Sequence, residues 1–109
     1  MKLNPRHVNA STALGMAYYY SNEPDRALAQ FDRSLAIDPK HSKTLLNQGI
    51  VRAFAKQDLK GAEKAWQRVL DVAPDSPEAA LAKRGLEGIR AQATQTGTPP
   101  AAKPPGGSE

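Results

Sequence analysis

The sequence predicts an all-α fold built from stacked pairs of helices, and three observations favour it. Three prolines, Pro5, Pro39 and Pro74, recur at intervals of 34 and then 35 residues, and a period in the thirties is typical of helical repeat proteins. Between the prolines, apolar residues recur three and four positions apart, as on one face of a helix. Gly15 returns as Gly49 after one period. We therefore expect an α-α superhelix, or solenoid, of two helix-turn-helix units and a C-terminal capping helix.

Each predicted helix begins and ends at residues that favour a helix terminus. Pro24 stands beside acidic residues, which suits a first helical turn. Ser42, Asp58 and Ser76 carry side chains that cap the first turn of a helix. The recurring prolines end the helices before them, because proline has no N–H and restricts the preceding residue. The expected helices cover residues 8–20, 24–37, 42–55, 58–72 (with residue 58 as the cap) and 77–91.

Composition divides the 109 residues into a lead, a folded part and a tail. Residues 1–7 read as the end of a preceding repeat, so we expect the chain to be part of a longer repeat protein. The tail has no large apolar side chain from Thr94 onward, and it therefore cannot bury enough surface to offset its chain entropy. The expected organisation is a lead at 1–7, units at 8–41 and 42–75, a capping helix at 76–92 and a disordered Pro/Gly-rich tail at 93–109.

The residues at fixed places in each unit resemble those of the tetratricopeptide repeat, a helix-turn-helix unit of 34 residues. The second unit repeats the small, aromatic and proline places of the first, with one residue inserted, which we expect in the turn at 56–58. The matching residues are Leu14, Gly15, Tyr18, Ala27, Phe31 and Pro39 in the first unit, and Gly49, Ala62, Trp66 and Pro74 in the second.

This resemblance implies that the first helix of each pair lines a concave groove that binds a peptide or a helix of a partner protein. The implied groove mixes apolar side chains, which could hold apolar side chains of the partner, with polar ones, which could hold its backbone or a carboxylate. Ala53 and Phe54 also fall at groove places, close to the inserted residue. The predicted partner-binding residues are Asn9, Thr12, Met16, Tyr19, Tyr20, Lys43, Leu46, Asn47 and Ile50.

The expected function is therefore a non-catalytic protein-interaction scaffold, and two alternatives stay open. In the first, the uncovered first helix docks onto another copy of the chain, because its apolar side lacks a partner. The second rests on the run from Gly49 to Pro74, which resembles repeat domains of bacterial cytochrome c maturation factors. That resemblance implies a module that presents apocytochrome.

Other classes of function receive no support from the sequence. The chain has no cysteine, and we expect no metal site, cofactor or catalytic residues. His7 and His41 occupy equivalent repeat positions, two packed helices apart, which is too far to share one metal ion.

The net charge of +4 comes from cations that are spread along the folded part rather than concentrated in one run, so no nucleic-acid partner is expected. No apolar run is long enough to cross a membrane, no targeting signal is recognisable, and a soluble cytoplasmic or periplasmic chain is expected.

Overall fold

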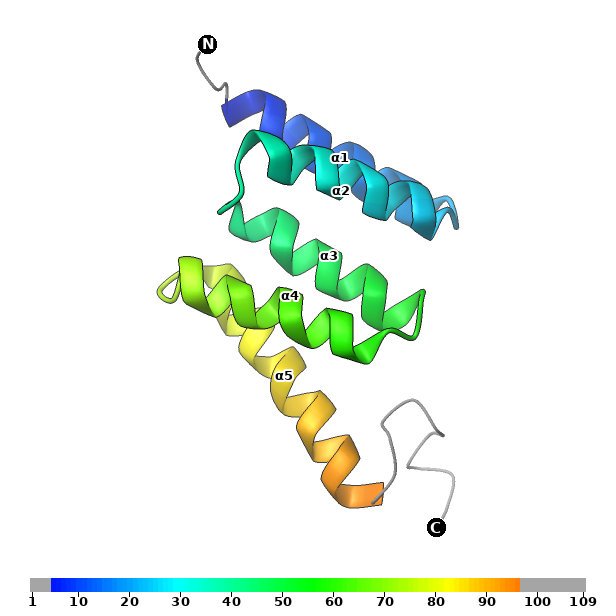
Figure 1. Ribbon diagram of the computed structural model, residues 1–109, viewed down its shortest axis with the longest axis vertical. Coiled ribbons are helices and arrows are strands. Elements are labelled where there is room, and N and C mark those ends of the chain that lie inside the picture. The colour runs from blue at the N-terminus through cyan, green and yellow to red at the C-terminus, as the bar shows by residue number, and fades with distance from the viewer. Residues whose placement is uncertain (1–4, 97–109) are drawn as a thin grey trace.

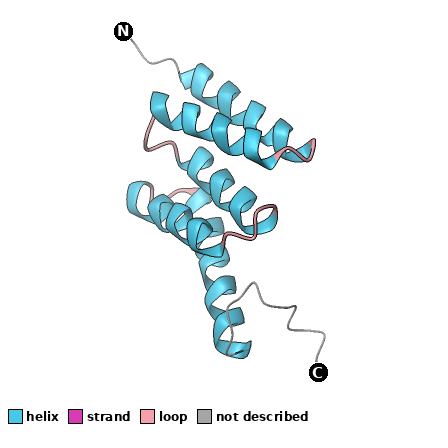
Figure 2. Ribbon diagram, turned by 45° about the vertical axis from the view of Figure 1, so that its right-hand side comes forward, coloured by secondary structure: helices cyan, strands magenta, loops and turns pink. Residues whose placement is uncertain are grey.

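The described part of the computed structural model consists of five helices, which form two stacked antiparallel pairs and one further helix (Figure 1). The structure describes the backbone of residues 5–96 and the side-chain surroundings of residues 7–92. The helices are α1 (Pro5–Tyr20), α2 (Pro24–Ile37), α3 (Ser42–Phe54), α4 (Leu59–Val72) and α5 (Pro77–Thr96). Helices α1 and α2 form the first pair, α3 and α4 form the second, and α5 packs against both helices of the second pair (Figures 1 and 2). Within residues 5–96 no helix is both long and apolar enough to span a membrane.

The observed helices confirm the predicted fold class, with corrections at both ends of the described chain. Helix α1 begins at Pro5 rather than residue 8, because a proline is well accommodated in the first helical turn. The predicted lead at 1–7 is therefore wrong over residues 5–7. Helix α5 continues to Thr96, through alanine and glutamine residues that favour a helix. The predicted disorder is therefore wrong over residues 93–96, and the rest of the predicted tail, 97–109, lies outside the described residues.

The caps predicted for α4 and α5 are confirmed, and the one predicted for α3 is wrong. The Gly61 N–H donates to Asp58 Oδ1 at 2.9 Å, and the Ala79 N–H donates to Ser76 Oγ at 3.1 Å. Ser42, in contrast, is the first residue of α3 and does not cap it. Its hydroxyl donates to Glu78 Oε1 of α5 at 3.1 Å. The serine thus ties α3 to the capping helix.

Both helical pairs turn through a residue with a left-handed backbone. Asn22 has φ 64° between α1 and α2, and Gln57 has φ 57° between α3 and α4. The position of Gln57 agrees with the predicted insertion at 56–58, because these residues lie between the two helices of the second pair. The extra residue is therefore accommodated in a loop and leaves the periodicity of both helices intact.

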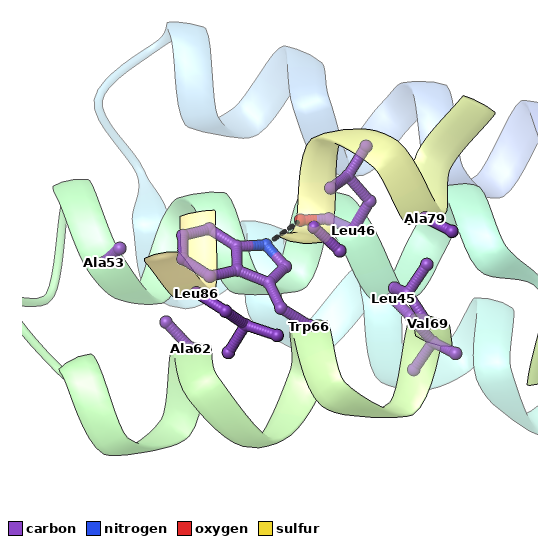
Figure 3. Close-up of a cluster of buried hydrophobic side chains, with 9 residues drawn as sticks. Leu45, Leu46, Ala53, Ala62, Trp66, Val69, Ala79 and Leu86 are labelled. Atoms are coloured by element: carbon purple, nitrogen blue, oxygen red, sulfur yellow. Dashed lines mark hydrogen bonds between the residues drawn. The ribbon is translucent and has the colours of Figure 1, made fainter. Parts of the chain in front are cut away.

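Two hydrophobic clusters hold the helices together, one for each pair. In the second cluster Trp66 of α4 is nearly enclosed by α3 and α5, and its indole N–H donates to the Leu46 carbonyl at 3.1 Å (Figure 3). In the first cluster Ala27 and Phe31 of α2 pack with Val51, which belongs to α3. Val51 therefore buries the surface between the two pairs and joins them into one stack.

Each large aromatic ring of the core lies directly against a glycine of a neighbouring helix. The Phe31 ring covers Gly15 of α1, and the Trp66 indole covers both Gly49 of α3 and Gly85 of α5. A methyl group at any of these three glycines would overlap the ring. The absence of a side chain there allows neighbouring helices to approach closely, and Gly15 and Gly49 are the glycines that recur after one period.

Replacing Gly49 with alanine should destabilise the fold by about 1–3 kcal/mol, the usual cost of overpacking a core. The enclosed Trp66 indole is rigid, so the added methyl group forces the helices apart. The measurement is urea unfolding followed by circular dichroism. The matched control is Gly88→Ala on α5, where a methyl group meets nothing within 4 Å. This control should gain about 0.5–1 kcal/mol, because alanine favours a helix over glycine. Equal stability of the two variants would contradict the packing argument.

Candidate functional site

The first helix of each pair, α1 or α3, carries a row of accessible side chains along one side. We call the two rows together the first-helix surface. On α1 the row has spacings of four, three and four residues, which lie on one side of a helix, and α3 repeats the row 34 residues later. Helices α1, α3 and α5 contact one another in series. The row consists of Asn9, Ala13, Met16 and Tyr20 on α1, and Lys43, Asn47, Ile50 and Phe54 on α3.

Two of the predicted groove residues, Thr12 and Leu46, are buried instead of lying on this surface. Their exposed fractions are 1% and 7%. Each stands one residue before the row and points toward the next first helix: Thr12 meets Thr44 of α3, and Leu46 joins a cluster that includes Ala82 of α5. These two side chains connect helices within the chain and offer a partner no surface. Ala53, at another implied groove place, is also buried.

At the amino-terminal end of this surface, a chain of polar contacts joins α1 to α3. His41 lies in the loop before α3, and its Nε2 is 3.0 Å from Asn9 Oδ1. Its Nδ1 is 2.6 Å from the Thr44 hydroxyl, which is in turn 2.6 Å from the Thr12 hydroxyl. Thr12 donates to the Val8 carbonyl at 2.8 Å. No pattern in the sequence indicated that the hydroxyl of Thr44 is buried at the centre of these contacts.

The direction of each hydrogen bond follows from the carbonyl at the end of this chain. A carbonyl only accepts, so Thr12 donates to Val8, Thr44 donates to Thr12, and His41 donates from Nδ1–H to Thr44. In the neutral imidazole, Nε2 then becomes an acceptor. A hydrogen bond with Asn9 in that form requires the amide to present its Nδ2–H to Nε2, because the Oδ1 that lies 3.0 Å from the ring can only accept. Asn9 is thereby engaged by His41, and Lys43 and Asn47 are the polar side chains that this end offers to a partner.

Burial lowers the pKa of His41 below its ordinary value of 6.5, and the nearby Lys43 acts in the same direction. Asp38 and Glu78 oppose this shift through their negative charges. The neutral imidazole is therefore the form that the folded chain favours. Among residues 7–92 no three or more acidic, histidine or cysteine side chains gather in a way that could hold a metal ion.

At the carboxyl-terminal end of the surface, exposed aromatic rings border an open depression of about 550 Å³. Tyr20 and Phe54 are 77% and 68% exposed, although large aromatic side chains are usually buried. The Tyr19 ring is half-buried and lies 5.5 Å from the Tyr20 ring, centroid to centroid. Three further residues line the depression and were not predicted from the sequence, namely Asn22, Pro24 and Ala55. Asn22 and Ala55 belong to turns and Pro24 begins α2, and no local pattern predicts that the two turns lie close together in space.

We expect the stability of the chain to fall as the pH is lowered through 6.5. The pKa of His41 is lowered by folding, so the unfolded chain takes up the proton first and acid favours unfolding. The stabilisation is complete above pH 6.5 and is lost as the pH falls toward and below the folded-state pKa. Urea unfolding between pH 5 and 8 measures this dependence, which His41→Gln should reduce.

The control variant is His7→Gln, which removes the exposed imidazole at the equivalent place before the first unit. It should keep the pH dependence of the unmodified chain. If His7→Gln reduced the dependence and His41→Gln did not, the assignment to the contact between His41 and Thr44 would be wrong.

The comparisons with known proteins agree with this geometry. Residues 8–41, which cover most of α1 and all of α2, match the family model of the tetratricopeptide repeat. Searches of curated proteins and of solved structures found no match. The matched segment and the glycine-to-aromatic contacts that recur in the second pair together lead to one conclusion: the chain contains a tetratricopeptide repeat at residues 8–41, and its second helical pair repeats the same packing.

Proposed function

We propose that the chain is a non-catalytic interaction module that binds a segment of another protein on its first-helix surface. The observation that carries this proposal is the pair of exposed aromatic side chains, Tyr20 and Phe54, at equivalent places of the two units. Exposed aromatic rings provide large apolar contact at a small cost in conformational entropy, and they are enriched among residues that dominate binding energy. Tetratricopeptide repeats are in general protein-interaction modules, which supports the same reading.

The distribution of polar and apolar side chains describes the segment that would fit. Lys43 and Phe54 lie on the same side of α3, eleven residues apart, and a rise of 1.5 Å per residue separates them by about 16 Å. An apolar anchor of the partner would occupy the depression beside Phe54, and an acidic group would lie near Lys43 and Asn47. That separation corresponds to about five residues of an extended segment, at about 3.3 Å per residue.

The narrower resemblance to cytochrome c maturation factors remains a prediction. Under that reading the bound segment would belong to apocytochrome, and it would occupy the same surface. Peptides selected from a random library test whether the bound segment belongs to a cytochrome. Selected sequences that resemble the haem-binding segment of a cytochrome would support this assignment, and unrelated sequences would contradict it.

Peptides selected for binding from a random twelve-residue library should carry an aromatic or large aliphatic residue about five positions from an acid. Binding of the selected peptide is measured by fluorescence anisotropy. Phe54→Ala should weaken it about 30-fold, which corresponds to the roughly 2 kcal/mol typical of a dominant interface residue. Lys43→Glu should weaken it as well, through charge repulsion. Because both side chains are exposed, circular dichroism should show an unchanged fold.

Arg33→Ala is the matched control, since Arg33 is exposed on α2 and lies outside the first-helix surface. It should leave the affinity unchanged. A selected peptide that binds equally to Phe54→Ala, Lys43→Glu and the unmodified chain would place the interaction elsewhere and refute the proposal.

Self-association is the second candidate, and a comparison between equivalent residues favours it. On α3 Thr44 and Val51 are buried against the first pair, and on α5 the equivalent Ala79 and Leu86 are buried against the second pair. The equivalent residues of α1 are Ala10 and Ala17, which are exposed together with Leu14 on the same side of the helix. This side of α1 is therefore an apolar docking surface without a partner within the described chain.

If a second copy covers this side of α1, the chain should form dimers at high concentration, and Leu14→Glu should abolish them. Leu14 is 44% exposed, so the substitution should leave the fold intact while placing a charge in the contact. Sedimentation velocity over a hundredfold range of concentration measures the association. A chain that stays monomeric throughout this range would exclude the second candidate.

A further inference from the structure

The second helical pair gathers basic side chains that are scattered in the sequence. An open groove of about 500 Å³ lies across α3 and α4. Lys60, Lys64 and Arg68 line it from α4, and Arg52 lines it from α3. Asp58 is the acidic side chain that lines the groove. Four cations and one acid leave an excess of three positive charges at one place, in a chain whose net charge is +4.

This basic groove and the first-helix surface lie on opposite sides of α3. At 100° per residue, Leu45, Gln48 and Arg52 project about 160° away from the row that contains Lys43 and Phe54. Leu45 and Gln48 also line the groove; Leu45 is buried in the core, and Gln48 offers a polar contact. The groove is therefore a second surface, and its occupation does not compete with a segment bound to the first-helix surface.

Three of the four cations have no ion-pair partner within the described residues. Arg52 is engaged, because its guanidinium donates to Asp58 Oδ2 at 3.0 Å. The ion pairs among residues 7–92 are those of Arg26, Arg52 and Lys56. Lys60, Lys64 and Arg68 form none there, although the charge of Lys64 also acts on Asp58. Cations placed four residues apart on a helix repel one another. A negatively charged ligand would relieve this repulsion.

We propose that this groove binds an acidic segment, rich in Asp or Glu, of a partner protein. Lys60, Lys64 and Arg68 follow one another at intervals of about 6 Å along α4, since each interval spans four residues. Alternate side chains of an extended segment repeat at about 6.8 Å, and acids at every fourth position of a helix repeat at about 6 Å. Either form of an acidic segment therefore places successive carboxylates opposite successive cations.

The lining of the groove favours a peptide over a nucleic acid. Single-stranded nucleic acids are held by aromatic rings that stack with bases as well as by cations. The residues lining the groove include no aromatic side chain, and the exposed rings of Tyr20 and Phe54 belong to the other surface. The cations of the groove instead offer charged contacts, which suit the carboxylate side chains of a polypeptide.

The test is a titration of the full chain with a fluorescein-labelled peptide of eight glutamates, followed by fluorescence anisotropy. Octaglutamate should bind at low ionic strength and should bind more weakly as salt screens the charges. Lys64→Glu, at the centre of the row on α4, should weaken binding about tenfold or more, because it replaces an attraction by a repulsion. Octaglutamine should not bind.

A matched variant separates the groove from net charge. Lys83→Glu makes the same change of net charge on the exposed side of α5. It should bind octaglutamate within about twofold of the unmodified chain, since the groove is intact. An equal loss in Lys83→Glu and Lys64→Glu would mean attraction to net charge alone and would overturn the proposal. If a twelve-nucleotide oligothymidine bound more tightly than octaglutamate, and Lys64→Glu weakened that binding, the proposal would also be overturned in favour of a nucleic-acid site.

Discussion

The contact between an aromatic ring and a glycine of the neighbouring helix is the constraint on which the stack depends. Phe31 against Gly15 fixes how closely α1 and α2 approach, and Trp66 against Gly49 does the same for α3 and α4. Because side chains in a close-packed core interdigitate with few voids, these contacts limit how closely the helices of each pair approach. Trp66 also contacts Gly85, so the same ring positions α5. The rows of side chains on the first helices are therefore held in register by the core.

Equivalent residues in α1, α3 and α5 have different surroundings, and this difference leaves some of their surfaces uncovered. Val51 and Leu86 are buried between successive layers, whereas the equivalent Ala17 of α1 is exposed. At the other end of the stack, Leu81 of α5 is exposed although the equivalent Leu46 is buried under α5. The sequence of a repeat thus determines which helix faces are apolar. The position of the repeat in the stack determines whether a neighbouring helix covers those faces.

The helices could be predicted from the sequence because their signals are local. Proline, glycine and capping residues such as Asp58 act within one turn of the chain, and their spacing gave the ranges of α2 and α4 closely. The burial of Thr12 could not be predicted in this way, since it depends on Thr44, which is 32 residues distant. The basic groove combines both kinds of signal. Lys60, Lys64 and Arg68 follow a local spacing of four residues on α4, whereas their proximity to Arg52 of α3 depends on the pairing of the two helices.

The placement of two surfaces on opposite sides of α3 has a consequence for how the chain can act. The described polar contacts near the two surfaces differ. Arg52 and Asp58 are hydrogen-bonded at the turn before α4, whereas His41 and Thr44 are in contact at the start of α3. If both surfaces bind as proposed, one chain would hold two partners at once, and α3 between them would fix their separation.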